Sequence, residues 1–481
     1  MELRINLISI FSCIAIYISF ILLPSITMIS DVYGDVTLTP SLSFSETYDD
    51  NIFLESYLGE DDDFITTISP GIRLLHTTRY STLSLDYTAG FESFVNNSEQ
   101  DNVRHSLLFD HTSQPLHFLR YGISDRFSIT QGDELIYDPT RRLGTSSSRT
   151  RTEIVSNDLS GHIESTIGTR IIPRINYSNI IEDVSSIRES APDESELDER
   201  DDIVEGNIAY LTNPSRDNRV YLSYIAGFYR YDRNNENSPT DNRDFDSYSI
   251  QLGYTHHFSP SLSSDISGGI GGVGLAYPGD IDDNPDYLVS VDIDKSFPDS
   301  RLSLRYSHDI RSGGGFGGAV LSDGVYLTFD HGITGDLSLG VRGSYVTNKF
   351  EYRDTPRNDN DIWSVGSDLR YNIFPWWSTA LSYRFILDLF EGEGGGPQTT
   401  QNAVTSFGFL IPDTQFQDIA ISFDFPIIEW LNIGLSYTYS KNIILGVGEE
   451  DTSRIQEYEH NRIMLSITLS PVLPIHRDTM L

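Results

Sequence analysis

The sequence predicts an all-β chain that folds as a transmembrane, antiparallel up-and-down β-barrel of about 20 strands (roughly 18–22). Three observations lead to this fold class. Many segments alternate between apolar and small polar residues. The connections between these segments alternate between short turns and long polar loops. Aromatic residues are abundant, with 27 Tyr and 25 Phe in 481 residues, and aromatic side chains favour strands.

The alternation has a period of two residues, which is the spacing of side chains on one face of a β-strand. From Leu431 to Tyr439 every odd position is apolar and every even position is small or polar. The segments Trp377–Leu389 and Arg462–Leu469 repeat the pattern. Such segments have about the length of a tilted strand that crosses a membrane, about 9–11 residues. In Trp377–Leu389 the side chains expected to face lipid are Leu381, Tyr383, Phe385 and Leu387.

The connections distinguish a membrane barrel from a soluble β fold. Short turns lie at 77–79, 113–117, 168–169, 213–218, 259–260, 297–300, 331–336, 375–376 and 426–430. Long loops lie between them, near 49–63, 94–102, 131–152, 182–202, 232–243, 278–285, 312–320, 351–361, 391–415 and 444–457. Outer-membrane barrels show this asymmetry, with short periplasmic turns and long extracellular loops. Nine short and ten long connections predict twenty strands, with both termini at the periplasmic end.

The first 34 residues are typical of a secretory signal peptide. Arg4 supplies a positive charge, and an apolar run from Ile5 to Leu23 follows it. Val32-Tyr33-Gly34 then offers a cleavage site before Asp35. The alternative is an N-terminal membrane anchor. The predicted organisation is a signal peptide over 1–34, a barrel over 35–470 and a C-terminal tail over 471–481.

Charge and cysteine content exclude several classes of function. The formal net charge of −37 excludes nucleic acid as a partner, because phosphate binding needs basic patches. The long loops carry acidic clusters, above all 182–202, which we expect to be an exposed extracellular segment. The only cysteine, Cys13, lies in the apolar run, so the mature chain has no thiol. We predict no catalytic residue, no metal site and no cofactor, and we do not expect an enzyme.

Two sets of side chains are assigned to the barrel from their positions in the predicted strands. Aromatic rings settle at the lipid–water interface, and the predicted girdle is Trp363, Trp376, Trp377 and Trp430. The second set consists of charged residues that alternate with apolar ones and should face the lumen: Asp86, Glu92, Arg305, Arg342, Asp368, Arg370 and Arg384. These charges could form a constriction that sorts solutes, or ion pairs that brace the wall, and the sequence leaves both open.

One segment resembles a known family. Residues Pro40–Leu54, with Tyr48-Asp49-Asp50-Asn51 near their end, are similar to the first strand of β-barrel porins found with exopolysaccharide biosynthesis and exosortase (PEP-CTERM) systems. Asp101–His105 and Tyr458–Ile463 are similar to later strand openings of that family. The resemblance implies an outer-membrane barrel that serves polysaccharide or envelope secretion, without catalytic residues. The chain ends on Asp478-Thr479-Met480-Leu481 rather than on an aromatic residue, which departs from many such barrels.

Two functions follow as expectations for a barrel in the outer membrane of a Gram-negative bacterium. The first is a porin-like channel linked to exopolysaccharide or envelope secretion. The second is a non-conducting structural or docking barrel of an envelope assembly. The expected partners are outer-membrane lipid, lipopolysaccharide and the barrel assembly machinery, and the resemblance adds polysaccharide secretion components. We expect no plug domain before the first strand, so any obstruction of the lumen should come from a loop, with 131–152 and 391–415 as the longest candidates.

Overall fold

The structure is a computed structural model. It describes residues 35–53, 61–132, 152–186, 197–213, 217–232, 244–275, 285–312, 319–349, 359–391, 403–404, 410–411, 413–445, 458–471 and 473–475. The predicted signal peptide, 1–34, lies outside the described residues, as do most of loops 131–152 and 391–415. No helix in the described part of the chain has the length and apolar character that a membrane crossing needs.

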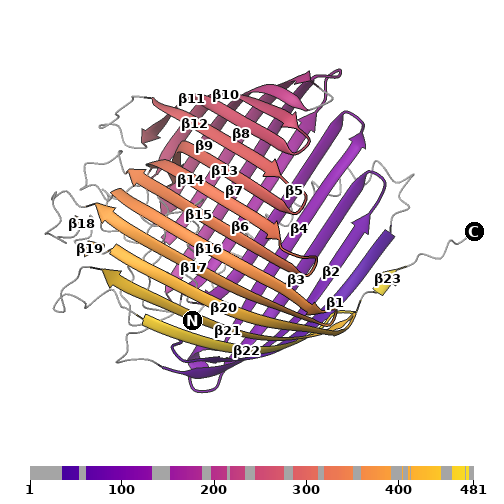
Figure 1. Ribbon diagram of the computed structural model, residues 1–481, viewed down its shortest axis with the longest axis vertical. Helices are drawn as coiled ribbons and strands as arrows, with labels where there is room; N and C mark the ends of the chain where they lie inside the picture. Colours follow the sequence, from indigo (N-terminus) through magenta and orange to yellow (C-terminus); the bar gives the residue numbers. More distant parts are fainter. Residues whose placement is uncertain are drawn as a thin grey trace, which may run out of the picture.

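Twenty long strands form the wall of the molecule (Figure 1). They are β1 (Asp35–Asp49), β2 (Asp63–Thr77), β3 (Ser81–Phe94), β4 (Asn102–Leu116), β5 (Leu119–Gly132), β6 (Thr152–Ser165), β7 (Ile171–Ser186), β8 (Leu197–Asn213), β9 (Asn218–Asp232), β10 (Phe245–Ser259), β11 (Leu262–Leu275), β12 (Asp286–Ser296), β13 (Ser300–Ser312), β14 (Ala319–Gly332), β15 (Leu337–Lys349), β16 (Asp359–Phe374), β17 (Trp377–Glu391), β20 (Asp413–Ile428), β21 (Leu431–Leu445) and β22 (Tyr458–Leu469).

Three short strands and one turn of 3₁₀ helix complete the described elements. The helical turn η1 (Ser98–Gln100) lies between β3 and β4. Strands β18 (Ala403–Val404) and β19 (Leu410–Ile411) pair with each other between β17 and β20. Strand β23 (Leu473–Ile475) pairs with β1. Pairing thus continues beyond residue 470, the boundary predicted for the barrel, because the chain resumes an extended course after Pro471.

The sheet closes on itself. Each long strand pairs antiparallel with the next one along the chain, and β1 pairs both with β2 and with β22. The closing register runs from Leu42 opposite Leu469 to Asp49 opposite Arg462. The predicted fold class and strand number are therefore confirmed: the chain is an all-β, antiparallel, closed barrel of twenty strands.

The connections alternate as predicted, and this gives the barrel two different ends. At one end the strands are joined by short turns, such as 78–80 and 375–376. At the other end they are joined by long loops, such as 133–151 and 446–457. We call these the short-turn end and the long-loop end; in outer-membrane barrels the short turns face the periplasm. One acidic loop is shorter than expected: within 182–202, β7 continues to Ser186 and β8 begins at Leu197.

The outer face of the barrel is apolar. Along many strands, exposed large hydrophobic side chains occupy alternate positions; Leu252, for example, is 60% exposed. Leu381 and Tyr383, predicted to face lipid, are also exposed. A closed barrel that exposes such a belt can shield it from water only in a membrane. We call the opposite face of each strand the inner face.

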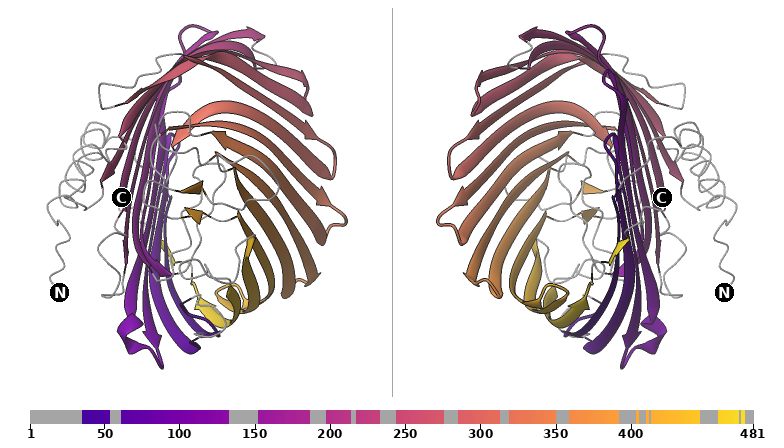
Figure 2. Two further views of the ribbon diagram at one scale, coloured as in Figure 1. Left: turned by 90° about the vertical axis from the view of Figure 1, so that its left-hand side faces the viewer. Right: turned by 90° about the vertical axis from the view of Figure 1, so that its right-hand side faces the viewer.

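The barrel has an elongated cross-section, and strands β9 to β11 form one narrow end of it (Figure 2). Glycines permit the sharp bend there. A Cβ atom at Gly269 of β11 would overlap the carbonyl oxygen of Ile250 in β10, and one at Gly271 would lie 2.9 Å from the carbonyl oxygen of Tyr248. The inner side of this bend therefore has no room for side chains at these two positions.

Candidate functional site: the inner wall and the closing seam

The seven charges predicted to face the lumen lie on the inner face, at positions that alternate with exposed or half-buried apolar residues. All except Arg370 take part in ion pairs between neighbouring strands. The pairs are Arg73–Asp86 (3.1 Å), Arg104–Glu92 (2.9 Å), Arg305–Asp292 (2.6 Å), Arg342–Asp368 (2.8 Å) and Arg384–Asp418 (3.6 Å). Arg370 has no such partner among the residues that the structure describes.

These ion pairs brace neighbouring strands, yet their arginines remain open to the lumen. The side chains of Arg305, Arg342 and Arg384 are 59%, 62% and 50% exposed. Exposed pairs contribute little to stability, about 0–1 kcal/mol each. The two interpretations left open by the sequence are therefore compatible: the same charges can brace the wall and present a mixed, charged surface to solutes.

The predicted tryptophan girdle divides between the two ends of the barrel. Trp376 and Trp430 are exposed in short turns, and Trp377 begins β17 next to Trp376. Trp363 lies on the outer face of β16 toward the long-loop end, where its ring contacts that of Tyr345 with centroids 4.3 Å apart. Both positions are where amphipathic rings would meet the two membrane interfaces.

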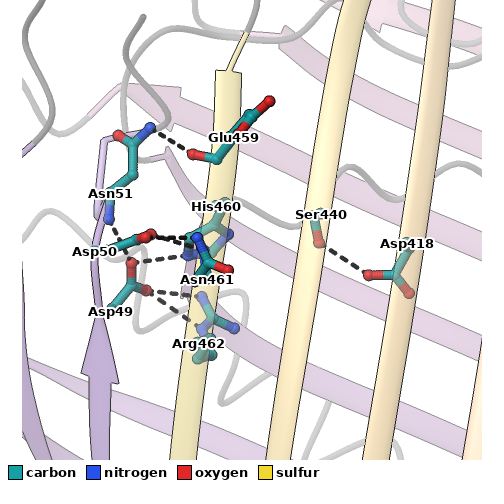
Figure 3. A network of polar contacts seen from close by, with 9 residues as sticks. All are labelled: Asp49, Asp50, Asn51, Asp418, Ser440, Glu459, His460, Asn461 and Arg462. Carbon is teal, nitrogen blue, oxygen red and sulfur yellow. Dashed lines mark hydrogen bonds and ion pairs between the residues drawn. The ribbon is translucent and has the colours of Figure 1, made fainter. Parts of the chain in front are cut away.

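A dense polar network closes the barrel at the long-loop end, where β1 meets β22 (Figure 3). Asp49 lies on the inner face and is almost fully buried. Its carboxylate lies 2.7 Å from Nε2 of His460 and accepts hydrogen bonds from Arg462 Nη2 at 3.2 Å and from the backbone N–H of Asn51 at 3.1 Å. The side-chain amide of Asn51 donates to the carbonyl oxygen of Glu459 at 3.0 Å.

The same seam is also locked on its outer face, because adjacent residues of a strand point to opposite faces. Asp50 accepts hydrogen bonds from the backbone N–H of Asn461 at 2.6 Å and from its side-chain amide at 2.7 Å. Asn461 in turn accepts a hydrogen bond from the hydroxyl of Tyr437 at 2.7 Å. We call residues Asp49–Asn51 and Glu459–Arg462 the seam latch. It joins two of the segments that carry the family resemblance, which lie 411 residues apart.

The polar network continues along the inner wall from the latch. Ser440 of β21 donates to Asp418 of β20 at 2.9 Å, and Asp418 pairs with Arg384 of β17. The guanidinium of Arg384 also lies 5.4 Å from the ring centroid of Phe416. Charged and hydroxyl groups thus occupy neighbouring inner positions from β17 to β1, as Figure 3 shows for the part from Asp418 to Asp49.

A second carboxylate is held like Asp49. Glu92 of β3 accepts a hydrogen bond from Asn102 Nδ2 at 3.1 Å and pairs with Arg104 Nη2 at 2.9 Å. In both places an Asn or His and an Arg, two residues apart at the start of a strand, hold the carboxylate of the neighbouring strand. Sequence reasoning noted both segments and placed Glu92 in the lumen, but it did not identify the partners.

The inner wall from β4 to β8 contains polar residues that the sequence analysis missed. A hollow of about 390 Å³ opens there, lined by residues that include Asp110, His162 and Arg174. On one side of it Arg174 donates to Asn176 at 2.7 Å, and Asn176 donates to Glu205 at 2.7 Å. The signal that could have found them is parity, since Arg174 and Asn176 alternate with Ile175 and Tyr177.

No family model matches the chain, and no curated protein matches it. The described residues contain no group of three or more His, Cys, Asp or Glu side chains that could hold a metal ion.

Several solved structures match the chain over most of its length. The siderophore receptor PirA from Acinetobacter baumannii matches with a TM-score of 0.51 and 7% identity over 92% of this chain and 81% of that one. The ferric citrate transporter FecA matches with a TM-score of 0.51 and 9% identity over 91% of this chain and 79% of that one. A mutant of the ferric enterobactin receptor PfeA from Pseudomonas aeruginosa matches with a TM-score of 0.52 and 8% identity over 90% of this chain and 81% of that one.

At these identities the likeness concerns the fold alone, and that fold is the outer-membrane β-barrel. Together with the apolar outer face, it places the chain in the bacterial outer membrane. The ligands of the similar structures do not transfer to this chain on this ground.

Proposed function

We propose that the chain is a porin-like channel of the outer membrane that serves exopolysaccharide or envelope secretion. The observation that carries the proposal is the charged inner wall of a wide barrel. Barrels of about 16–18 strands already leave an aqueous channel, and this one has twenty. Exposed guanidinium groups on the inner face need water around them, because an unsolvated charge would be very costly.

The link to polysaccharide secretion rests on the resemblance of Pro40–Leu54, Asp101–His105 and Tyr458–Ile463 to the exosortase-associated porins. The inner wall is compatible with a neutral, hydroxyl-rich solute, because it alternates paired charges with Ser, Thr and Asn side chains. The proposed partners of the protein are lipopolysaccharide, the barrel assembly machinery and components of polysaccharide secretion. We propose no catalytic step for it.

A second candidate is a non-conducting barrel that docks or braces an envelope assembly. Two observations favour it. The end of the β13–β14 hairpin leaves the wall and enters the lumen, as described below. The β18–β19 pair lies beyond the long-loop end in Figure 1 and in front of the opening in the left view of Figure 2.

Replacing Arg384 by Glu should shift the ion selectivity of the channel toward cations. The substitution removes the cationic partner of Asp418 and changes the charge of the wall by two units. The measurement is the reversal potential of the purified protein in a planar bilayer under a salt gradient; Arg305→Glu, beside Asp292, should act in the same direction.

Lys441→Glu is the matched control. Lys441 is adjacent to Ser440 in β21, but it lies on the outer face and pairs with Glu459 there. The Lys441→Glu substitution changes the net charge by the same two units as Arg384→Glu but leaves the inner wall unaltered, so the reversal potential should not change. Folded wild-type protein should give discrete conductance steps. If it gives none, either intact or after the parts of loops 131–152 and 391–415 that lie between the wall strands (133–151 and 392–412) are replaced by short linkers, the channel is refuted and the docking barrel is the better proposal.

A further inference from the structure

The hairpin formed by β13 and β14 leaves the wall near the long-loop end. Pairing between β12 and β13 stops at Val289 opposite His308, although β13 continues to Ser312. Beyond His308, β13 pairs only with β14, as far as Ser312 opposite Ala319; we call the paired segments Asp309–Ser312 and Ala319–Ser322 the hairpin end. In Figure 2 this part of the chain, drawn in coral, curves from the wall into the interior of the barrel.

Burial shows that the hairpin end packs on both faces. Four consecutive residues of β14, from Ala319 to Ser322, are each at most 7% exposed. Successive residues of a strand point to opposite faces, and in a membrane barrel one of those faces would normally be exposed to lipid. Both faces of this segment are instead covered by protein.

The two faces pack against different parts of the wall. Ala319, with Ile310, packs in a cluster with Tyr229, Tyr231 and Phe245 of β9 and β10 and Val273 of β11; the rings of Tyr229 and Phe245 stack at 4.2 Å. Val320 packs in a second cluster with Val346, Ile362 and Ile386 of β15, β16 and β17. The hairpin end therefore bridges two opposed sections of the barrel.

A polar contact fixes the far side of this bridge. Ser312 Oγ donates to the Glu199 carboxylate at 3.1 Å, and the Tyr231 hydroxyl also contacts Ser312. Glu199 belongs to β8, which is separated from β13 by β9, β10, β11 and β12 around the wall, so this hydrogen bond crosses the lumen. Glu199 is only 3% exposed. A carboxylate buried to this degree persists only with strong partners, so its contacts select one position of the hairpin.

Resting on the channel function proposed above, we propose that the β13–β14 hairpin end is the constriction of the pore and that Glu199, Tyr231 and Ser312 hold it across the lumen. It covers the inner face of β15 and β16 there, and it reduces the open cross-section at the long-loop end to the part bounded by β17 to β22 and β1 to β7. That part includes the seam latch and the Arg384–Asp418 pair. Solutes would pass along that wall, and the hairpin would set the largest size admitted.

The placement of the hairpin can be tested by cross-linking. The predicted mature chain has no cysteine, so Glu199→Cys with Ser312→Cys introduces one defined pair. A short bis-methanethiosulfonate reagent should join them, and the joined chain should migrate differently from the reduced one on a denaturing gel. Glu199→Cys with Ser344→Cys is the control, because Ser344 lies on the inner face of β15 and bonds to Ser364 of β16. If the Glu199→Cys/Ser312→Cys pair gives no more cross-linked product than the control pair, the inferred position of the hairpin end is wrong.

The constriction is tested by Ser312→Ala and Glu199→Ala in planar bilayers and in liposome swelling with sugars of increasing size. Both variants should show a larger unitary conductance and admit larger sugars than the wild type. Glu205→Ala is the control: Glu205 is on the same inner face of β8, but it bonds along the wall to Asn176 and Ser223. Ser312→Ala removes only a hydroxyl, so it tests the inference even if Glu199→Ala does not fold.

The outcomes separate the constriction from the channel itself. Cross-linking together with increased conductance supports both. If wild type conducts, cross-linking succeeds and Ser312→Ala conducts like the Glu205→Ala control, the constriction is refuted and the channel stands. If cross-linking succeeds but neither wild type nor the variants conduct, the channel function is refuted together with the constriction, and only the placement of the hairpin remains.

Discussion

Replacing Asp49 by Ala should destabilise the closed barrel by about 3–5 kcal/mol, the usual effect of removing one partner from a buried ion pair. The side chains of Asp49 and His460 are 2% and 8% exposed, so water cannot replace the missing carboxylate. Arg462 loses its contact with the Asp49 carboxylate as well. The measurement is the urea midpoint of unfolding in detergent, followed by the mobility of unheated protein on a denaturing gel.

Asp86→Ala is the matched control for the latch. Asp86 also pairs with an arginine on the inner face, but its side chain is 35% exposed and that of Arg73 is 60% exposed. Its removal should cost at most about 1 kcal/mol. If both variants lose the same stability, the latch is no more than an ordinary wall contact.

Leu435→Arg is expected to have the second largest effect, a loss of about 2–4 kcal/mol if the residue lies near the middle of the membrane. Leu435 is 40% exposed on the outer face of β21, five residues from the turn that precedes the strand and well inside both ends. An arginine there would displace lipid contacts and bury its charge in hydrocarbon. The same unfolding measurement applies, in vesicles rather than detergent.

The neighbouring substitution Ser436→Arg provides the comparison for Leu435→Arg. Ser436 lies on the inner face of β21. Arginines already occur on the inner wall, so replacing Ser436 by Arg should change stability little. The two positions differ by one residue, and a slip of one residue would exchange their faces. A greater loss from Ser436→Arg than from Leu435→Arg would mean that the register of β21 is inverted.

Much of the fold could be predicted from the sequence because both signals used are local. A period of two in the apolar residues is visible in each strand alone, as in Leu431–Tyr439. The alternation of turn and loop lengths then fixes the number of strands. Neither signal depends on which distant segment a strand meets, and this is why all twenty strands could be located.

The partners in the candidate site could not be predicted, because they depend on contacts between distant segments. The latch joins Asp50 to Asn461, and no local pattern links them, although closure of any barrel must bring its first and last strands together. The inward hairpin was also missed: the sequence predicts a long external loop near 312–320, and apolar residues that pack inside look the same as those that face lipid. Glu199 lies in the acidic segment 182–202, whose charge predicts an exposed loop, yet it is buried.

The most direct test of the central claim is cysteine labelling along β21. If the proposed channel is open, a membrane-impermeant methanethiosulfonate reagent added to intact cells should modify Ser436→Cys and Thr438→Cys, which lie on the inner face. It should spare Ile433→Cys and Leu435→Cys, which lie on the outer face. Labelling of the odd positions would contradict the assignment of the two faces. Protection of all four positions would show that no water path reaches the inner wall, and would contradict the channel.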